Sequence, residues 1–369
     1  MIALTGSFDV AVIGAGPAGV AAACALRSLG IGTVLFGESR NSSVEGVSER
    51  TLARLRAAGL ESAAACAMGP GERTGTWGAS EVAAGSEYLV DRSVFDAALA
   101  QDATIAGVQR VTQSVASADF REGGWHLQTS AGVFKCKAVL DGRGRHSRGA
   151  PLRGPRLVSV SQRFSSEHQG RVRTAVHAMA EGWCWLADDG RGSRWVQVIC
   201  APSAVQATAD ISRRIAESLR EIPQRAAFLD GALALGAPTL RAAVARMSPA
   251  APSRGTLRIG DACIAMDPLS GHGIHEALGS ARLAAAAIHR YLESDDWDAV
   301  SQLMNERTRE IWERMTKTAA SFYRQQATHA PTPFWTQAAS AYESLAVAAR
   351  FGGQGQVGQE RSMPFALGG

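Results

Sequence analysis

The chain has 369 residues, of which 46% are hydrophobic and 20% are charged, and its formal net charge is +4 at pH 7. This composition is that of a soluble globular protein and excludes disordered and fibrous chains, and the small net charge gives no reason to expect nucleic acid as a partner. A chain of this length exceeds the size at which a single core keeps growing, so we expect two domains or one large domain with insertions.

The cysteine pattern and the hydropathy bear on metal binding, on the redox state of the thiols and on membrane insertion. There is no C-x-x-C pair and no histidine pair at metal-ligand spacing, so we expect no metal site, reduced thiols and a cytoplasmic location. No run of about 18 apolar residues occurs, so we expect no membrane span. The six cysteines are scattered: Cys24, Cys66, Cys136, Cys184, Cys200 and Cys263.

The N-terminus has the pattern of a strand, a glycine loop and a helix. An apolar strand over residues 10–13 runs into Gly14, Gly16 and Gly19 at G-x-G-x-x-G spacing, and residues 20–29 follow as an alanine-rich helix. Gly14 permits a tight turn, Gly16 lets backbone N–H groups approach phosphate oxygens, and Gly19 lets the helix pack close to the strand. The positive end of the helix dipole favours phosphate at this loop.

A carboxylate completes this unit. Residues 33–36 predict a second strand, and Glu38 follows it about 20 residues beyond the glycines, where an acidic side chain accepts hydrogen bonds from ribose hydroxyls. The first forty residues therefore predict a dinucleotide site.

The next segment mixes helical and irregular patterns. Residues 48–60 predict a helix with Ser48 as its N-cap. Residues 69–85 are glycine-rich and predict an irregular segment, whereas residues 87–103 begin as a strand and turn into a helix at Asp91, with Arg92 at the helix start. The helix dipole disfavours a cation at that position, so either a ligand anion or simple solvent exposure accounts for Arg92.

A β-hairpin and a second glycine loop occupy the middle of the chain. Residues 125–129 and 133–140 alternate apolar and polar side chains around the turn at 130–132. The second strand leads into Asp141-Gly142-Arg143-Gly144-Arg145-His146-Ser147. A glycine loop thus again follows an apolar strand.

The pattern changes from residue 151 onward. Four short segments rich in Val and Trp predict a mainly antiparallel sheet. A helix is expected over residues 207–219, and a second helical region up to residue 246. The four segments are residues 157–164, 173–180, 182–189 and 193–200.

The C-terminal part returns to the first pattern and then becomes helical. Residues 256–292 read as a strand, a third glycine loop and a helix. Residues 295–325 and 335–351 predict two further helices, and the Gly/Gln-rich tail from residue 352 predicts loose structure.

Three glycine loops, each after an apolar strand, now stand at the start, the middle and the far end of the chain. In their order and spacing they make residues 9–292 resemble the superfamily of FAD-dependent monooxygenases and flavin-dependent halogenases with the p-hydroxybenzoate hydroxylase fold. The resemblance implies an α/β fold. It has a Rossmann-like FAD-binding domain of the glutathione reductase type, an inserted, mainly antiparallel substrate sheet and C-terminal helices. The implied parts are residues 1–150 and 254–292 (FAD-binding domain), 151–253 with part of 69–90 (substrate domain), 293–351 (C-terminal helices) and 352–369 (tail).

The resemblance also implies roles for single residues. In the superfamily the first loop holds the FAD pyrophosphate, an acid such as Glu38 holds the adenosine ribose, and an aspartate such as Asp261 holds ribityl hydroxyls. The loop from Pro268 places N–H groups beside the flavin's pyrimidine edge, where a helix N-terminus stabilises negative charge on the reduced flavin. The residues implied for FAD binding are Gly14, Gly16, Pro17, Gly19, Glu38, Arg92, Asp141, Gly142, Asp261, Pro268, Gly271, Gly273 and Ile274.

One departure bears on the reaction. Gly182-Trp183-Cys184-Trp185-Leu186 resembles the G-W-x-W-x-I-P segment of tryptophan halogenases, but Ala187 and Asp188 replace Ile-Pro. Those halogenases use a lysine in the N-terminal third to deliver hypohalous acid, and this chain has no lysine before Lys135. Trp77-Gly78 stands about where that lysine is expected. The resemblance therefore favours hydroxylation of an aromatic ring over halogenation.

The implied chemistry uses reduced FAD and O₂, which form a C4a-hydroperoxide that hydroxylates an electron-rich ring. NAD(P)H or a reduced flavin is expected to supply the electrons. A halogenase-like hydroxylase without the lysine resembles the flavoproteins that mature tryptophylquinone cofactors, which implies a tryptophan in a partner polypeptide as substrate. A small aromatic metabolite, a reductase of the geranylgeranyl reductase type and a non-enzymatic FAD scaffold remain alternatives.

Candidate catalytic and docking residues follow from the same patterns. His272, His275 and Glu276 follow the third loop and are candidates for a base or an orienting group, although the flavin chemistry does not require one. The arginines between Arg153 and Arg173 and the Trp183/Trp185 strand are candidate docking features for a polypeptide, with core packing as the alternative for the tryptophans.

Overall fold

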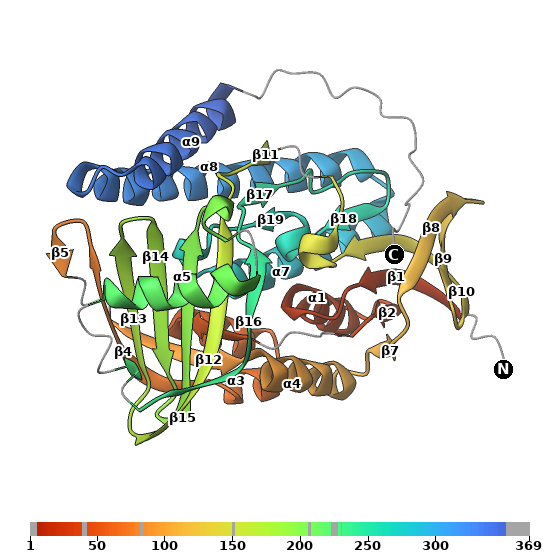
Figure 1. Cartoon of the computed structure of the whole chain (residues 1–369). Helices are drawn as coiled ribbons and strands as arrows, with labels where there is room; N and C mark the ends of the chain where they lie inside the picture. The colour runs from red at the N-terminus through yellow and green to blue at the C-terminus, as the bar shows by residue number, and fades with distance from the viewer. Residues whose placement is uncertain are drawn as a thin grey trace.

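The computed structural model describes residues 6–38, 43–81, 85–149, 152–205, 208–222, 228–229 and 231–351. The predicted tail from residue 352 lies outside them. The described chain forms two large β-sheets, with most of the helices gathered beside the smaller one and the two C-terminal helices lying across the top (Figure 1). The α/β fold expected from the sequence is confirmed.

The smaller sheet joins strands from both ends of the sequence. Its order is β7-β2-β1-β10-β9-β8, and β18 also pairs with β10. The β9–β10 pair is the predicted hairpin, and β1, β10 and β18 run parallel, so their carboxyl ends meet at one edge. The strands are β1 (Gly6–Ile13), β2 (Thr33–Phe36), β7 (Gln109–Val111), β8 (Val115–Arg121), β9 (Gly124–Thr129), β10 (Gly132–Asp141) and β18 (Thr256–Arg258).

Helices cover this sheet. The buried alanines of α1 let it pack tightly between the sheet and α7. Ser48 caps α2 as predicted, because its side chain accepts a hydrogen bond from the N–H of Thr51 at 3.3 Å. The helices are α1 (Pro17–Ser28), α2 (Glu49–Ala57), α3 (Glu61–Ala65), α4 (Arg92–Ile105) and α7 (Gly273–Ser294).

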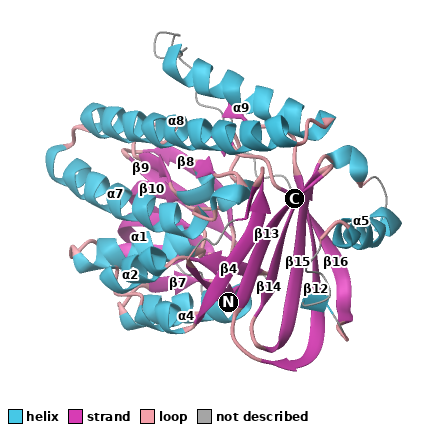
Figure 2. Cartoon of the chain, turned by 90° about the vertical axis from the view of Figure 1, so that its left-hand side faces the viewer, coloured by secondary structure: helices cyan, strands magenta, loops and turns pink. Residues whose placement is uncertain are grey.

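The larger sheet forms the second layer (Figure 2). Its order is β16-β12-β15-β14-β13-β4-β6-β3, with β5 (Ser80–Glu81) on β4, and only the β4–β13 pair is parallel. Ile211 and Ile215 of α5 (Thr208–Arg220) pack on its outer face. The strands are β3 (Val44–Val47), β4 (Met68–Trp77), β6 (Ser86–Asp91), β12 (Val158–Gln169), β13 (Arg173–Met179), β14 (Gly182–Asp188), β15 (Arg191–Cys200) and β16 (Leu233–Ala242).

Two expectations about secondary structure are wrong. The glycine-rich segment from residue 69 is not irregular, since its first part belongs to β4. The glycines are needed there because a Cβ at Gly71 would lie 2.3 Å from the Val172 carbonyl oxygen, and one at Gly75 would lie 2.2 Å from the Val176 carbonyl oxygen of the neighbouring strand. The glycine content therefore reflects close strand pairing.

The helical region expected up to residue 246 is instead the edge strand β16. Alanine and leucine favour a helix locally, but Gly236 adopts a φ of +66° and Pro238 follows it. The Gln162 side chain donates to the carbonyls of Leu235 and Gly236 at 3.0 and 3.3 Å. Pairing with β12 thus overrides the local preference.

The C-terminal helices α8 (Trp297–His329) and α9 (Pro333–Phe351) lie side by side across the top of both layers (Figures 1 and 2). Indole N–H groups attach them to the larger sheet: Trp77 donates to the Phe322 carbonyl at 2.9 Å, and Trp335 donates to the Met179 carbonyl at 2.8 Å. Among the described helices, none is long and apolar enough to cross a membrane.

Both helices also hold a buried carboxyl group. Asp267 is 2% exposed and accepts hydrogen bonds from the hydroxyls of Tyr323 on α8, at 3.1 Å, and of Tyr342 on α9. Burial raises the pKa of Asp267, and the hydrogen bond from Tyr342 partly offsets this effect. Asp267 follows β19 (Ile264–Ala265), which forms a small sheet with β11 (Leu152–Arg153) and β17 (Arg246–Met247).

We predict that Tyr342→Phe lowers the free energy of unfolding by about 1–3 kcal/mol, because a buried acceptor loses a donor. Urea unfolding measures this change. Tyr88→Phe is the control, since the Tyr88 hydroxyl lies near the surface beside Glu49, and it should change stability by about 0.5 kcal/mol or less. Equal effects of the two variants would contradict the role given to Asp267.

Candidate functional site

Three loops meet at the carboxyl edge of the smaller sheet. The N–H of Gly142 donates to the carbonyl of Ile13 at 2.7 Å, and the N–H of Ile259 donates to the carbonyl of Asp141 at 3.0 Å. The loops after β1, β10 and β18 are therefore in backbone contact, as their glycines led us to expect.

The glycines of the first loop have different physical roles. A Cβ at Gly14 would lie 2.4 Å from the Gly142 carbonyl oxygen, and one at Gly19 would lie 1.8 Å from the Gly14 oxygen. At Gly16 no heavy atom lies within 4 Å of the Cβ position. Gly16 caps α1, whose first residue is Pro17, so open space lies directly beside a helix N-terminus.

Glu38 and Arg92 differ in their surroundings. Glu38 is exposed just after β2, next to β1. Arg92 is 8% exposed and lies 3.0 Å from Asp96 and 2.5 Å from Glu45. Although burial opposes its charge, these two carboxylates raise the pKa of Arg92. Intramolecular partners thus explain why a cation tolerates the start of α4, and its predicted place near the FAD phosphate stays a prediction.

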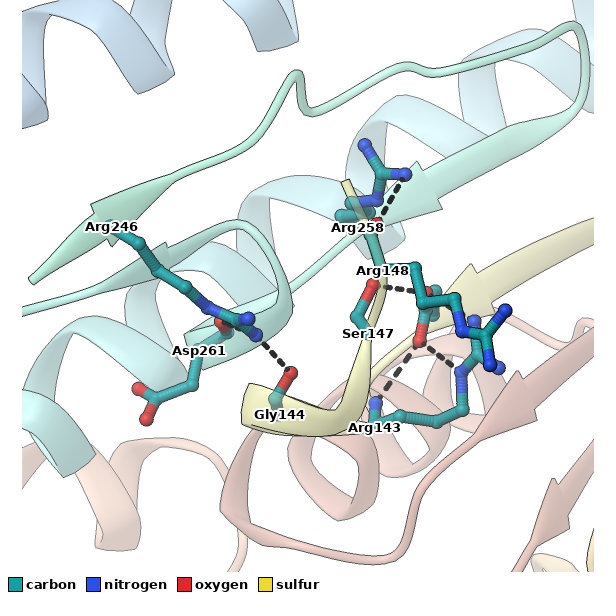
Figure 3. A network of polar contacts seen from close by, with 8 residues as sticks. Arg143, Gly144, Ser147, Arg148, Arg246, Arg258 and Asp261 are labelled. Carbon is teal, nitrogen blue, oxygen red and sulfur yellow. Dashed lines mark hydrogen bonds and ion pairs between the residues drawn. The ribbon is translucent and has the colours of Figure 1, made fainter. Parts of the chain in front are cut away.

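The second loop is held together by its own side chains (Figure 3). Asp141 is 1% exposed and accepts hydrogen bonds from the Arg143 guanidinium at 2.9 Å and from Ser147 Oγ at 2.8 Å. Burial alone would raise the pKa of Asp141, but these hydrogen bonds lower it below its usual value. The Asp141 carboxylate therefore fixes the loop from within.

Two arginines join the second and third loops. Arg145 lies 3.3 Å from the Asp261 carboxylate. Arg246 donates to the Gly144 carbonyl at 2.9 Å and to the Asp261 carbonyl at 3.3 Å (Figure 3). The Asp261 side chain keeps 37% of its surface exposed, although the dense protein around it raises its pKa. Sequence reasoning missed Arg246, which belongs to none of the glycine motifs.

The loop from Pro268 to Gly273 leads into α7. Asp267 accepts a hydrogen bond from the Leu269 N–H at 2.8 Å, and Gly271 adopts a φ of +60° that favours glycine. Around Gly271 and Gly273 no heavy atom lies within 4 Å of the Cβ position, whereas Ile274 is buried and anchors the helix. The loop thus exposes its backbone at Gly271 and Gly273 to open space, while the hydrogen bond from the Leu269 N–H to the buried Asp267 carboxylate holds it in place.

A first cavity of about 280 Å³ lies between this loop and the inner face of the larger sheet. The loop and Asp261 line one side of it, and Trp183 and Trp185 line the other. Trp183 donates to the Tyr323 hydroxyl at 3.4 Å, and Trp185 donates to Glu87 at 3.5 Å. The tryptophans are therefore both packed in the sheet and exposed to this cavity.

A second cavity of about 580 Å³ lies between β4, the start of α7 and α8. The two cavities share a wall that includes Leu269, Ser270 and His272. The apolar residues of the second cavity come from β4 and α8 and include Trp77, Ile311, Met315, Ala319 and Phe322.

The three candidate catalytic residues all line the second cavity. The His272 and His275 rings are 6.1 Å apart. Burial, aided by the Arg54 charge, lowers the pKa of His275, and its buried Nδ1 has no hydrogen-bond partner in the described structure. The Glu276 carboxylate lies 3.9 Å from Arg314. Their position fits a role beside the reacting ring, which stays a prediction.

No lysine reaches either cavity. The chain has three lysines, and Lys135 and Lys137 lie on β10 while Lys317 lies on α8, 43% exposed and paired with Glu313. None of them lines a cavity. The expectation drawn from the sequence, that a halogenase-type lysine is missing, agrees with this geometry.

The arginines proposed for docking do not form one feature. Arg153 lies on β11 and Arg163 on β12, where its guanidinium donates to Ser193 and lies 5.5 Å from the Trp195 ring. Arg173 pairs with Asp188 at 2.8 Å. Arg163 and Arg173 thus have partners within the protein, whereas Arg153, Arg156 and Arg171 are exposed. A role of this segment in docking stays a prediction.

The residues present fit FAD. The open backbone at Gly16 beside the N-terminus of α1 suits the pyrophosphate, and the open backbone at Gly271 and Gly273 suits the flavin edge. Asp261, partly exposed between them, offers acceptors for the ribityl hydroxyls.

Comparisons with known proteins agree with this geometry. Residues 155–366 match the family model described as tryptophan halogenase, and residues 7–132 match the model described as FAD binding domain. No curated protein sequence matches the chain.

Solved structures give more detail. The chain is similar to the peptidyl tryptophan dihydroxylase QhpG, essential for tryptophylquinone cofactor biogenesis, with 29% identity and a TM-score of 0.81 over 91% of this chain and 79% of that one. It shares its fold with the flavin-dependent halogenase CmlS, with 23% identity and a TM-score of 0.78 over 90% and 67%. It also shares its fold with a geranylgeranyl bacteriochlorophyll reductase-like protein from Thermoplasma acidophilum, with 18% identity and a TM-score of 0.70 over 93% and 92%.

Gly16→Ala and Gly19→Ala should separate cofactor binding from folding. Gly19→Ala places a methyl group against the Gly14 carbonyl and should cost about 1–3 kcal/mol of stability. Gly16→Ala meets no protein atom and should change stability by about 0.5 kcal/mol or less, yet weaken FAD binding about tenfold or more. Thermal unfolding of the apoprotein and FAD titration measure the two effects. Unchanged FAD affinity in Gly16→Ala would contradict the site.

His275 should titrate below its ordinary value near 6.5, so it is neutral at pH 7. We predict that an NMR titration of its imidazole gives a midpoint below 6.5, and that Arg54→Gln raises that midpoint because one repelling charge is removed. A midpoint at or above 6.5 in the unaltered protein would refute this environment for His275.

Proposed function

Since this chain belongs to the tryptophan halogenase family and is an FAD-dependent oxidoreductase, we propose that it is a monooxygenase that hydroxylates the indole ring of a tryptophan in a partner polypeptide. The reaction would serve the biogenesis of a tryptophylquinone cofactor. The proposal includes O₂ as co-substrate, NAD(P)H or a reduced flavin as electron donor, and a cytoplasmic location.

The second cavity is the observation that carries the proposal. Its volume of about 580 Å³ accommodates an indole with part of the attached chain, and its aromatic and aliphatic walls suit a flat apolar ring. The wall that it shares with the first cavity is the loop assigned to the flavin edge. A ring in this cavity would therefore lie across that loop from the cofactor.

The absence of lysine from both cavities supports hydroxylation rather than halogenation. FAD, when bound and reduced, supplies the two electrons with which O₂ is split, one oxygen atom entering the ring and the other leaving as water. The N–H groups at the start of α7 would stabilise negative charge on a flavin held beside them. The buried walls formed by Trp77 and Met315 would exclude water from the reacting ring.

The polypeptide substrate is the finer part of the proposal. QhpG, at 29% identity, is described as acting on a peptidyl tryptophan. The second cavity also reaches the surface, since Phe322 is 45% exposed and the Arg314 side chain is 59% exposed. A ring attached to a chain outside the protein could therefore enter it.

Mass spectrometry after incubation with ¹⁸O₂, FAD and a reductant tests the proposal. The substrates are a tryptophan-bearing partner polypeptide and free tryptophan, each with chloride and bromide present. We expect labelled oxygen on the polypeptide alone and no halogenated product. Label on free tryptophan would indicate small-molecule metabolism, halogenated product would indicate a halogenase, and flavin turnover without label would favour the reductase alternative.

A cavity-filling variant gives this experiment an internal control. Ala319→Phe places a large side chain in the second cavity and should abolish labelling of the polypeptide. The FAD content should stay unchanged, because Ala319 does not line the first cavity.

A further inference from the structure

Three arginines from three different elements surround the second cavity. Arg50 comes from the first turn of α2, Arg73 from β4 and Arg314 from α8. We name Arg50, Arg73 and Arg314 the arginine rim.

The arginine rim differs from the structural arginines of the protein. Arg92 and Arg173 have carboxylate partners within 3.0 Å. Arg314 lies 3.9 Å from Glu276, and Arg73 lies 3.8 Å from Glu87, both beyond hydrogen-bond distance. Within the described ranges, no rim guanidinium donates a hydrogen bond to a protein acceptor. Their donors therefore remain available to a ligand.

Not every rim arginine around the cavity has a carboxylate partner. The carboxylates that line it are Asp267 and Glu276. Asp267 is buried and already accepts hydrogen bonds from two tyrosine hydroxyls, and the Glu276 side chain is 26% exposed and faces Arg314. Glu87, which lines the first cavity, lies 3.8 Å from Arg73. Within the described residues Arg50 forms no ion pair, so its exposed guanidinium at the mouth of the cavity attracts an anion.

The shape of the cavity determines where that anion must lie. The apolar residues of α8 and β4 form the walls that suit a ring, whereas Arg50 is exposed and the Arg314 side chain is 59% exposed. An anionic group would therefore contact the rim while the ring attached to the same molecule fills the interior. Guanidinium groups bind carboxylates in a bidentate manner, with strong charge-assisted hydrogen bonds.

We propose that the arginine rim binds acidic side chains that flank the target tryptophan in the partner polypeptide, so that this protein selects an aromatic residue in an acidic segment. The inference rests on the proposed function, because it assigns a sequence preference to the polypeptide substrate. It makes Arg50 and Arg314 residues of substrate specificity.

Binding of fluorescent peptides to the FAD-loaded protein, measured by anisotropy, tests the inference without turnover. The peptides carry one central tryptophan with Glu, Gln or Lys on both sides. We expect the Glu peptide to bind at least about tenfold more tightly than the Gln peptide, with the difference shrinking as salt is raised. Equal affinity of the Glu and Gln peptides would overturn the inference.

Charge reversal identifies the residues. Arg50→Glu and Arg314→Glu should each weaken binding of the Glu peptide by about tenfold and strengthen binding of the Lys peptide. Arg309→Glu is the matched control, because Arg309 is exposed on the same helix but does not line the cavity, and it should leave both affinities nearly unchanged. FAD content and thermal unfolding establish that each variant is folded. An equal effect of Arg309→Glu would mean that the overall charge of the protein, rather than contact with the arginine rim, attracts the peptide, and this would contradict the proposal.

The ¹⁸O₂ experiment on the same peptides separates the two levels of the argument. Hydroxylation of Glu and Gln peptides with equal kcat/KM would leave the proposed function intact and refute the rim. Selective binding of the Glu peptide without labelled product would support the rim and refute hydroxylation of tryptophan.

Discussion

The contact of bare backbone among Gly14, Gly19 and Gly142 is the constraint on which the site depends. A Cβ at Gly14 would lie 2.4 Å from the Gly142 carbonyl oxygen, so the first two loops can meet only if position 14 lacks a side chain. A Cβ at Gly19 would lie 1.8 Å from the Gly14 oxygen, so α1 can pack against the first loop only if position 19 lacks one. Their contact leaves open space at Gly16 beside the start of α1, and Arg145 and Arg246 then bring in the third loop. One extended cofactor can therefore contact loops that are more than a hundred residues apart in the sequence.

The C-terminal helices support the third glycine loop and α8 forms part of the second cavity. Asp267 lies immediately before the loop that exposes Gly271 and Gly273, and the hydroxyls of Tyr323 and Tyr342 connect it to α8 and α9. The same α8 supplies Ile311, Met315 and Phe322 to the second cavity. The element that fixes the flavin loop thus also forms the aromatic pocket, so the positions of cofactor and ring depend on a common support.

The parts of the site predicted from sequence are those with local chemistry. Glycine spacing after an apolar strand predicts a phosphate loop because the turn, the close approach and the helix start all lie within a few residues. Long-range pairing was not predictable in this way. The glycines of β4 locally favour irregular structure and the residues of β16 locally favour a helix, whereas pairing with distant strands makes both segments β-structure. The carboxylate partners of Arg92 include Glu45, which the local pattern around Arg92 does not predict. The second cavity and its arginine rim could not be predicted from the sequence either, because β4, α2 and α8 come together only in the folded chain.

A crystal structure of the FAD-bound protein with a tryptophan-bearing peptide tests the central claim most directly. The account predicts FAD along the three glycine loops, with its flavin beside Gly271 and Gly273, and the indole in the cavity lined by Trp77, Met315 and Phe322. An indole bound against Trp183 and Trp185 in the first cavity, or a flavin away from the loop that Asp267 supports, would contradict it.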